Sequence, residues 1–151
     1  MKGLIRKILR EQTENTVLVV FGGVRSATAE WMLDQIPEWI KNSRTIIAKE
    51  WDSDVSKVLL DEEGNAIEYG RLEVTGFSAG GYNVFKLANA KNPDFVGLID
   101  PSVPEGWSLN GFPTTSTLFY DNSNWTGNNV KGIKARQPLL EAEMLEKGMK
   151  V

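Results

Sequence analysis

A serine stands at the centre of the segment Gly76-Phe77-Ser78-Ala79-Gly80-Gly81. This segment matches the pattern G-x-S-x-G, in which a sharp strand-to-helix turn exposes a serine hydroxyl as a nucleophile. Gly76 and Gly80 lie two residues to either side of Ser78, where neighbouring backbone must pass close by. A helix N-terminus behind the serine would favour a developing negative charge. The spacing therefore predicts acyl-transfer chemistry at Ser78.

The flanking residues supply the elements that this turn requires. Residues 72–77 form an apolar run that predicts a strand, and residues 79–90 carry apolar residues at helical spacing. Asn92-Pro93 then ends the predicted helix. A strand directly before the motif and a helix directly after it give the G-x-S-x-G pattern its structural meaning.

Strands and helices alternate along the rest of the chain. We predict further strands at 16–21, 44–48, 95–99 and 117–120, with the start of a sixth at 149–151. Helical spacing recurs around residues 28–40, interrupted by Pro37, and again at 138–147. This alternation predicts a single α/β domain over residues 1–151, a three-layer sandwich with a mostly parallel, doubly wound sheet of about five to six strands. A flavodoxin-like sheet would follow the same logic.

With these elements in place, residues 16–151 resemble the α/β-hydrolase family. The resemblance rests on the serine turn at 76–80, on the glycine-containing segment 19–24, on the strand that ends in Asp100-Pro101, and on the strand that ends at Asp121. In the family, a histidine usually stands in the glycine-containing segment, at the position that Phe21 occupies here. The resemblance implies a minimal α/β-hydrolase-like core.

The resemblance also implies roles for individual residues. Ser78 would be the nucleophile, and an oxyanion hole would form from the backbone N–H of Ala79 and that of Gly23 or Val24, in the loop that begins at Gly22. Asp121 would orient a catalytic base, and Asp100 is a second candidate for that acid. The substrate would be an ester or a related acyl compound.

The base itself is missing, because the chain contains no histidine and no cysteine. A serine hydroxyl without a base is a poor nucleophile near neutral pH. Three interpretations remain open. The chain is part of a longer esterase-like hydrolase, or it is an inactive relative that serves as a binding or assembly component, or another group acts as base. For the last, Lys49 is the one lysine near the expected pocket rim, and a second chain is an alternative source.

Charge, apolar runs and motif spacing exclude several other classes of protein. A net charge of −3 gives no general attraction to nucleic acid, and no run approaches the ~20 apolar residues of a membrane span. The acidic residues between 52 and 63 do not follow calcium-loop spacing, and no nucleotide fingerprint occurs, so we expect neither metal nor cofactor. Residues 1–12 predict an amphipathic helix without the continuous apolar core of a secretion signal, which favours a cytoplasmic protein.

Two further expectations concern partners and aromatic residues. An open sheet edge near Val151 would favour association with another chain. The expected partner is therefore either a small acyl substrate at Ser78 or a protein at this edge. Trp31 and Trp39 are expected to face the core. Trp107, Phe112 and Trp125 lie in loops that follow predicted strands, where they would either line an apolar part of the pocket or cover the sheet edge left by a missing strand.

Overall fold

The computed structural model describes residues 15–24, 28–120 and 135–151. The strands are β1 (Thr16–Phe21), β2 (Thr45–Lys49), β3 (Arg71–Phe77), β4 (Phe95–Ile99) and β5 (Thr117–Tyr120). The helices are α2 (Thr28–Asp34), α3 (Glu38–Asn42), α4 (Gly80–Lys91) and α5 (Gln137–Glu146), with a 3₁₀ turn η1 (Val55–Lys57). The helix expected at 1–12 and the residues Asp121 and Trp125 lie outside the described residues.

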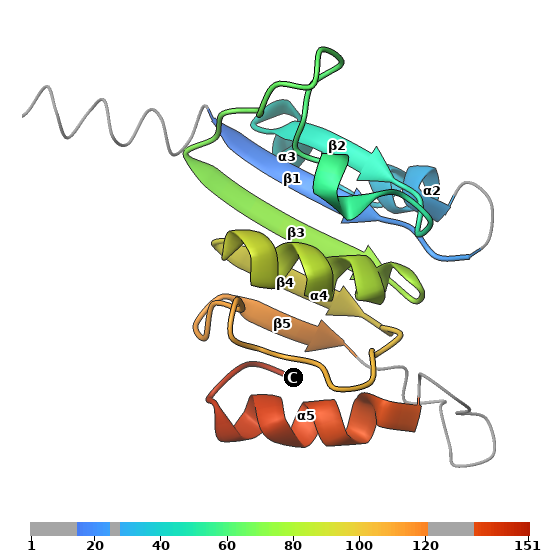
Figure 1. Ribbon diagram of the computed structural model, residues 1–151, viewed down its shortest axis with the longest axis vertical. Helices are drawn as coiled ribbons and strands as arrows, with labels where there is room; N and C mark the ends of the chain where they lie inside the picture. The colour runs from blue at the N-terminus through green and yellow to red at the C-terminus, as the bar shows by residue number, and fades with distance from the viewer. Residues whose placement is uncertain (1–14, 25–27, 121–134) are drawn as a thin grey trace, which may run out of the picture.

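The strands form one sheet in the order β2-β1-β3-β4-β5, and every neighbouring pair is parallel (Figure 1). This confirms the predicted α/β three-layer fold, with an all-parallel sheet. Every residue of β1 is buried, as expected for a strand covered on both faces. Beyond β5 the predicted sixth strand is a single bridge, in which the Phe119 N–H donates to the Lys150 carbonyl at 3.1 Å.

One face of the sheet carries the main core. Helices α4 and α5 lie on this face, together with η1 (Figure 1). Val84 and Leu87 of α4 and Leu140 and Met144 of α5 are each at most 2% exposed. Burial of these side chains against alternate residues of β1, β3, β4 and β5 provides most of the hydrophobic stabilisation. We call this side the α4 face.

The opposite face is covered only in part, by α2 and α3. Met32 of α2 packs with Leu18 and Val20 of β1 in a smaller cluster. Pro37 separates the two short helices, as predicted from its lack of an N–H donor. The expectation that both tryptophans here face the core is wrong, because Trp31 is 51% exposed and Trp39 70% exposed. We call this side the α2 face.

The short helices explain that error. Helix α2 has seven residues and α3 has five, so neither extends across the sheet. If residues 28–40 formed one helix, Trp31 and Trp39 would lie on the same side of it. Because α2 and α3 are separate helices, this expectation does not apply. No helix in the described ranges is long and apolar enough to cross a bilayer.

Candidate active site

The sheet order places the motif at a specific point. From β1 the chain moves outward to β2 and then returns past β1 to β3, so the direction of winding reverses between β1 and β3. Open α/β sheets bind ligands at this reversal, outside the carboxyl ends of the strands. Gly22 and Gly23 follow β1 there, and Ser78 follows β3. Flavodoxin-like sheets share this order, so strand order alone does not define the chemistry.

Ser78 adopts the strained conformation that its motif predicts. Its φ is +52°, in the left-handed region that residues other than glycine seldom occupy. The Ser78 N–H donates to the Ile99 carbonyl at 3.0 Å, and the Ser78 carbonyl accepts from Gly81 at 2.9 Å and Ser102 at 2.7 Å. The side chain is half-buried. Strain of this kind costs about 1–3 kcal/mol and persists where surrounding contacts enforce it.

Two glycines let the turn pack against neighbouring backbone. A Cβ on Gly80 would lie 2.6 Å from the Phe21 carbonyl oxygen and 2.7 Å from that of Gly22. A Cβ on Gly76 would lie 2.7 Å from the Gly80 carbonyl oxygen. A side chain at Gly80 would therefore separate the serine turn from the end of β1, and one at Gly76 would separate β3 from the start of α4. This is the close approach expected from the sequence.

The same packing brings Gly23 against the serine. A Cβ on Gly23 would lie 3.4 Å from the Ser78 Cβ. The Gly22 N–H donates to the Lys49 carbonyl at 2.9 Å, so it cannot serve as an oxyanion donor. The N–H groups of Gly23 and Ala79 form no hydrogen bond within the described part of the chain. Two backbone donors therefore remain near Ser78, while Val24 beside them is 66% exposed.

Asp100 is the carboxylate that follows β4 at this edge. It is buried, and its φ of +43° is also in the left-handed region. Its Oδ1 accepts a hydrogen bond from Gln137 Nε2 at 3.0 Å, and the same nitrogen donates to the Pro101 carbonyl at 2.8 Å. Sequence reasoning found Asp100 but gave no indication of Gln137, because their contact joins segments 37 residues apart.

A second carboxylate was not anticipated. Glu50 follows β2, and its Oε2 lies 2.9 Å from where a Cβ on Gly22 would be. The Glu50 side chain is half-buried and follows the carboxyl end of its strand, as Ser78 does. The signal available in the sequence was its position directly after a predicted strand. Lys49, the lysine considered as a base, is exposed at the end of β2.

The loop aromatics belong to the core rather than to the site. Phe112 is buried against Phe85, with ring centroids 5.0 Å apart. The Trp107 indole N–H donates to Glu143 Oε2 at 2.5 Å, and its ring packs against the main core. Both therefore cover the α4 face of the sheet. In the described residues, the acidic stretch between 52 and 63 forms no group that could hold a metal ion.

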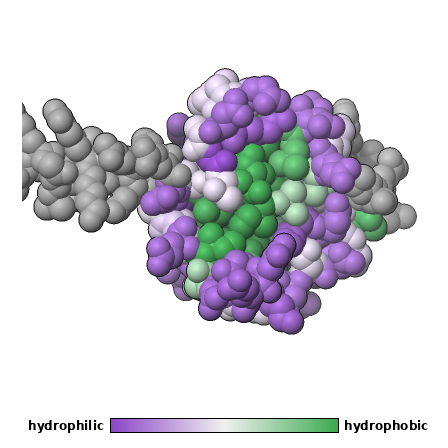
Figure 2. All heavy atoms as spheres, turned by 90° about the horizontal axis from the view of Figure 1, so that it is seen from above, coloured by the Kyte–Doolittle hydropathy of each residue, from purple (hydrophilic) through white to green (hydrophobic). Residues whose placement is uncertain are grey.

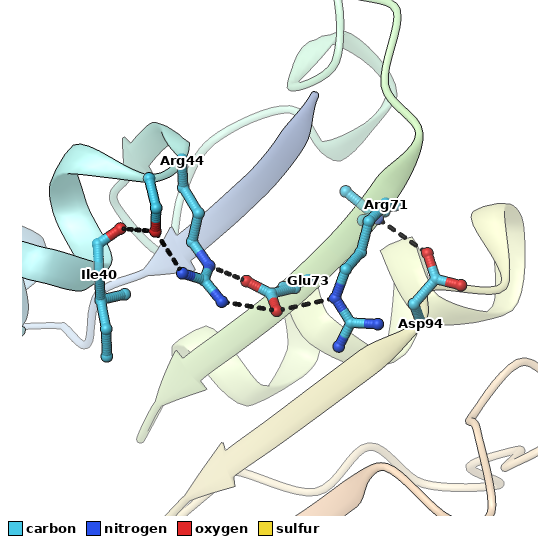
Figure 3. A network of polar contacts seen from close by, with 7 residues as sticks. Ile40, Arg44, Arg71, Glu73 and Asp94 are labelled. Carbon is cyan, nitrogen blue, oxygen red and sulfur yellow. Dashed lines mark hydrogen bonds and ion pairs between the residues drawn. The ribbon is translucent and has the colours of Figure 1, made fainter. Parts of the chain in front are cut away.

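An apolar groove of about 470 Å³ lies on the α2 face. Phe77, the residue before Ser78, lines it together with Trp31 and Ile99. Toward the amino ends of the strands, Arg44 and Glu73 also line the groove. Figure 3 shows the polar contacts that join these two residues. Glu73 there binds Arg44 Nε at 2.5 Å and Arg71 Nε at 3.1 Å. The groove is thus apolar around Phe77 and Ile99 and ionic at its far end.

Comparisons with protein-family models, with curated proteins and with solved structures found no match to this chain. The functional interpretation therefore depends on the residues and geometry described above.

Proposed function

We propose that this chain is a serine-hydrolase-type protein that acts on an ester or related acyl substrate through Ser78. The observation that carries the proposal is the strained Ser78 at the reversal point of the sheet, with the N–H groups of Gly23 and Ala79 beside it, which form no hydrogen bond to any residue that the structure describes. Backbone donors in such positions stabilise the oxyanion of a tetrahedral intermediate. The strain supports a use for the turn, because it lowers stability otherwise.

In the reaction, Ser78 Oγ attacks the acyl carbon and the alkoxide of the substrate leaves. The hydroxyl proton must pass to a base that the histidine-free sequence does not contain. We propose that the base comes from outside the residues present here. The adjoining apolar groove supports an acyl group with an apolar portion.

The absence of histidine favours a second candidate function. A relative that has lost catalysis would keep the turn and use the same edge to bind a ligand or another protein. Asp100 supports this alternative, because its carboxylate is held by Gln137.

A fluorophosphonate probe distinguishes the two candidates. Ser78 Oγ would attack phosphorus and displace fluoride, and intact mass would then show one adduct. We expect this adduct in the native protein, accelerated by added imidazole as a substitute base, and its loss in Ser78→Ala. Ser102→Ala is the matched control, since Ser102 is a buried serine at the same edge and should not be labelled. No adduct with or without imidazole would support the binding role instead.

A further inference from the structure

The two edges of the sheet differ in what covers them. Beside β5, Lys150 forms a bridge to Leu118. Strand β2 ends the sheet on the other side, and in the described residues no hydrogen bond reaches the outward backbone groups of Ile46 or Ala48. An edge strand with unpaired N–H and C=O groups is a template for another strand.

The direction of these groups follows from one hydrogen bond. The Lys49 carbonyl accepts from Gly22 in the β1 segment, so Thr45, Ile47 and Lys49 direct their backbone groups toward β1. Ile46 and Ala48 then direct theirs away from the sheet. Figure 2 looks onto this side of the molecule and shows a continuous hydrophobic area bordered by hydrophilic surface. Ile46, Ile47 and Ala48 are half-buried here rather than covered.

We infer that β2 pairs with β2 of a second copy of this chain, antiparallel and with the two-fold axis at Ile47. Residues equally far from Ile47 then come opposite one another. Ile46 of one copy lies opposite Ala48 of the other, and the outward N–H and C=O groups of these two residues bond to each other in a hydrogen-bonded pair. Ile47 meets Ile47 in a non-hydrogen-bonded pair.

Charge selects this register over its neighbours. With the axis at Ile47, Arg44 of one copy lies opposite Glu50 of the other, and the symmetry repeats this pair at both ends of the interface. Arg44 makes three hydrogen bonds, to Glu73 and Ser43, so two of its five donors remain for Glu50. An axis at Ile46 would place Arg44 opposite Ala48, and an axis at Ala48 would place Glu50 opposite Ile46. Opposite charges across a strand pair stabilise it. The axis at Ile46 has no such pair, and the axis at Ala48 brings Arg44 opposite only Asp52, which lies in the turn after β2 and not in line with the strand.

Engineered cysteines test the register, because the chain has no cysteine of its own. Non-hydrogen-bonded partners have Cα atoms about 4.5 Å apart, within the range that a disulfide spans. We expect Ile47→Cys to form a covalent dimer under mild oxidation, seen by non-reducing electrophoresis. Thr45→Cys and Lys49→Cys should each give no disulfide-linked dimer alone and a mixed disulfide when combined, because positions 45 and 49 face each other.

Both flanking positions are exposed, so the mixed pair remains informative if Ile47→Cys does not fold. Self-pairing of Thr45→Cys or Lys49→Cys as efficient as the mixed pair would overturn the proposal, as would the absence of a disulfide both from Ile47→Cys and from the mixed pair. Ala48→Pro gives an independent measurement by light scattering. It removes one outward N–H and leaves the bonds to β1, so we expect a lower dimer fraction at equal concentration with unchanged circular dichroism. An unchanged dimer fraction, or a native protein that is monomeric at every concentration, would contradict the inference.

Discussion

The two faces of the sheet are built from alternate residues of the same strands, yet they differ in burial. In β5, Thr117 and Phe119 point to the α4 face and are buried, whereas Leu118 and Tyr120 are exposed. In β4, Ile99 is 37% exposed beside the buried Leu98. Parallel sheets are generally covered on both faces. The difference shows that stability is concentrated on the α4 face, while the α2 face keeps apolar surface available for contact.

Two leucines give the sharpest test of this difference. Leu140 on the α4 face is fully buried, and Leu118 on the α2 face is 43% exposed. We expect Leu140→Ala to lower the free energy of unfolding by about 2–5 kcal/mol, because it leaves a cavity. Leu118→Ala should change it by less than about 1 kcal/mol. Urea unfolding followed by circular dichroism measures both, and equal losses would contradict the comparison.

The ionic cluster at the end of the groove should give the next largest effect. The Glu73 carboxylate is 9% exposed and lies between Arg44 and Arg71. Glu73→Gln keeps the shape and removes the charge, so we expect a loss of about 1–3 kcal/mol in unfolding free energy. Glu38→Gln is the control, because Glu38 pairs with Lys41 while 79% exposed. That loss should stay below about 0.5 kcal/mol, and a similar loss in both variants would show that the cluster adds no stability.

The serine turn lies between the two faces, and its strain predicts a gain in stability. Ser78→Gly removes the side chain that makes a φ of +52° unfavourable. After the entropy cost of glycine, we expect a rise of about 1 kcal/mol in unfolding free energy, with loss of probe labelling. Asn92→Gly is the matched control at a φ of +48°, where asparagine is already tolerated. Destabilisation by Ser78→Gly would show that the hydroxyl holds the turn together.

The smallest effect concerns η1, at the border of the α4 face. Hydrogen bonds from the Ser56 side chain and backbone lower the pKa of Asp54 below its usual value. A lowered folded-state pKa gives a stabilisation that is present above the unfolded pKa and is lost as pH falls through the folded one. Asp54 is fully exposed, so the change in stability should be slight. Carboxyl titration by nuclear magnetic resonance should show Ser56→Ala raising the Asp54 pKa, and an unchanged titration would contradict this assignment.

The bounds of the strands could be predicted from the sequence more accurately than the side chains that the helices bury against the sheet. Strands β1, β4 and β5 begin and end where their apolar runs do. For β1 the reason is that a parallel strand buried on both faces requires continuous apolar residues. Ser78 and its glycines were also predictable, since the motif specifies a local turn. The exposure of Trp31 and Trp39 was not predictable, because it depends on how far two short helices extend over the sheet. Glu50 and Gln137 were also missed, because the contacts that place them join segments far apart in the sequence.

The central strand pair also has a consequence for synthesis. Strand β1 pairs with β3 from Thr16↔Arg71 to Phe21↔Gly76, so its partner is made 55 residues later. At a translation rate of about 5–20 residues per second, β1 waits roughly 3–11 s for that partner. During this interval its five apolar residues cannot have both of the neighbouring strands that bury them. Folding should therefore be slow to start, and a nascent chain should depend on chaperones until β3 has left the ribosome.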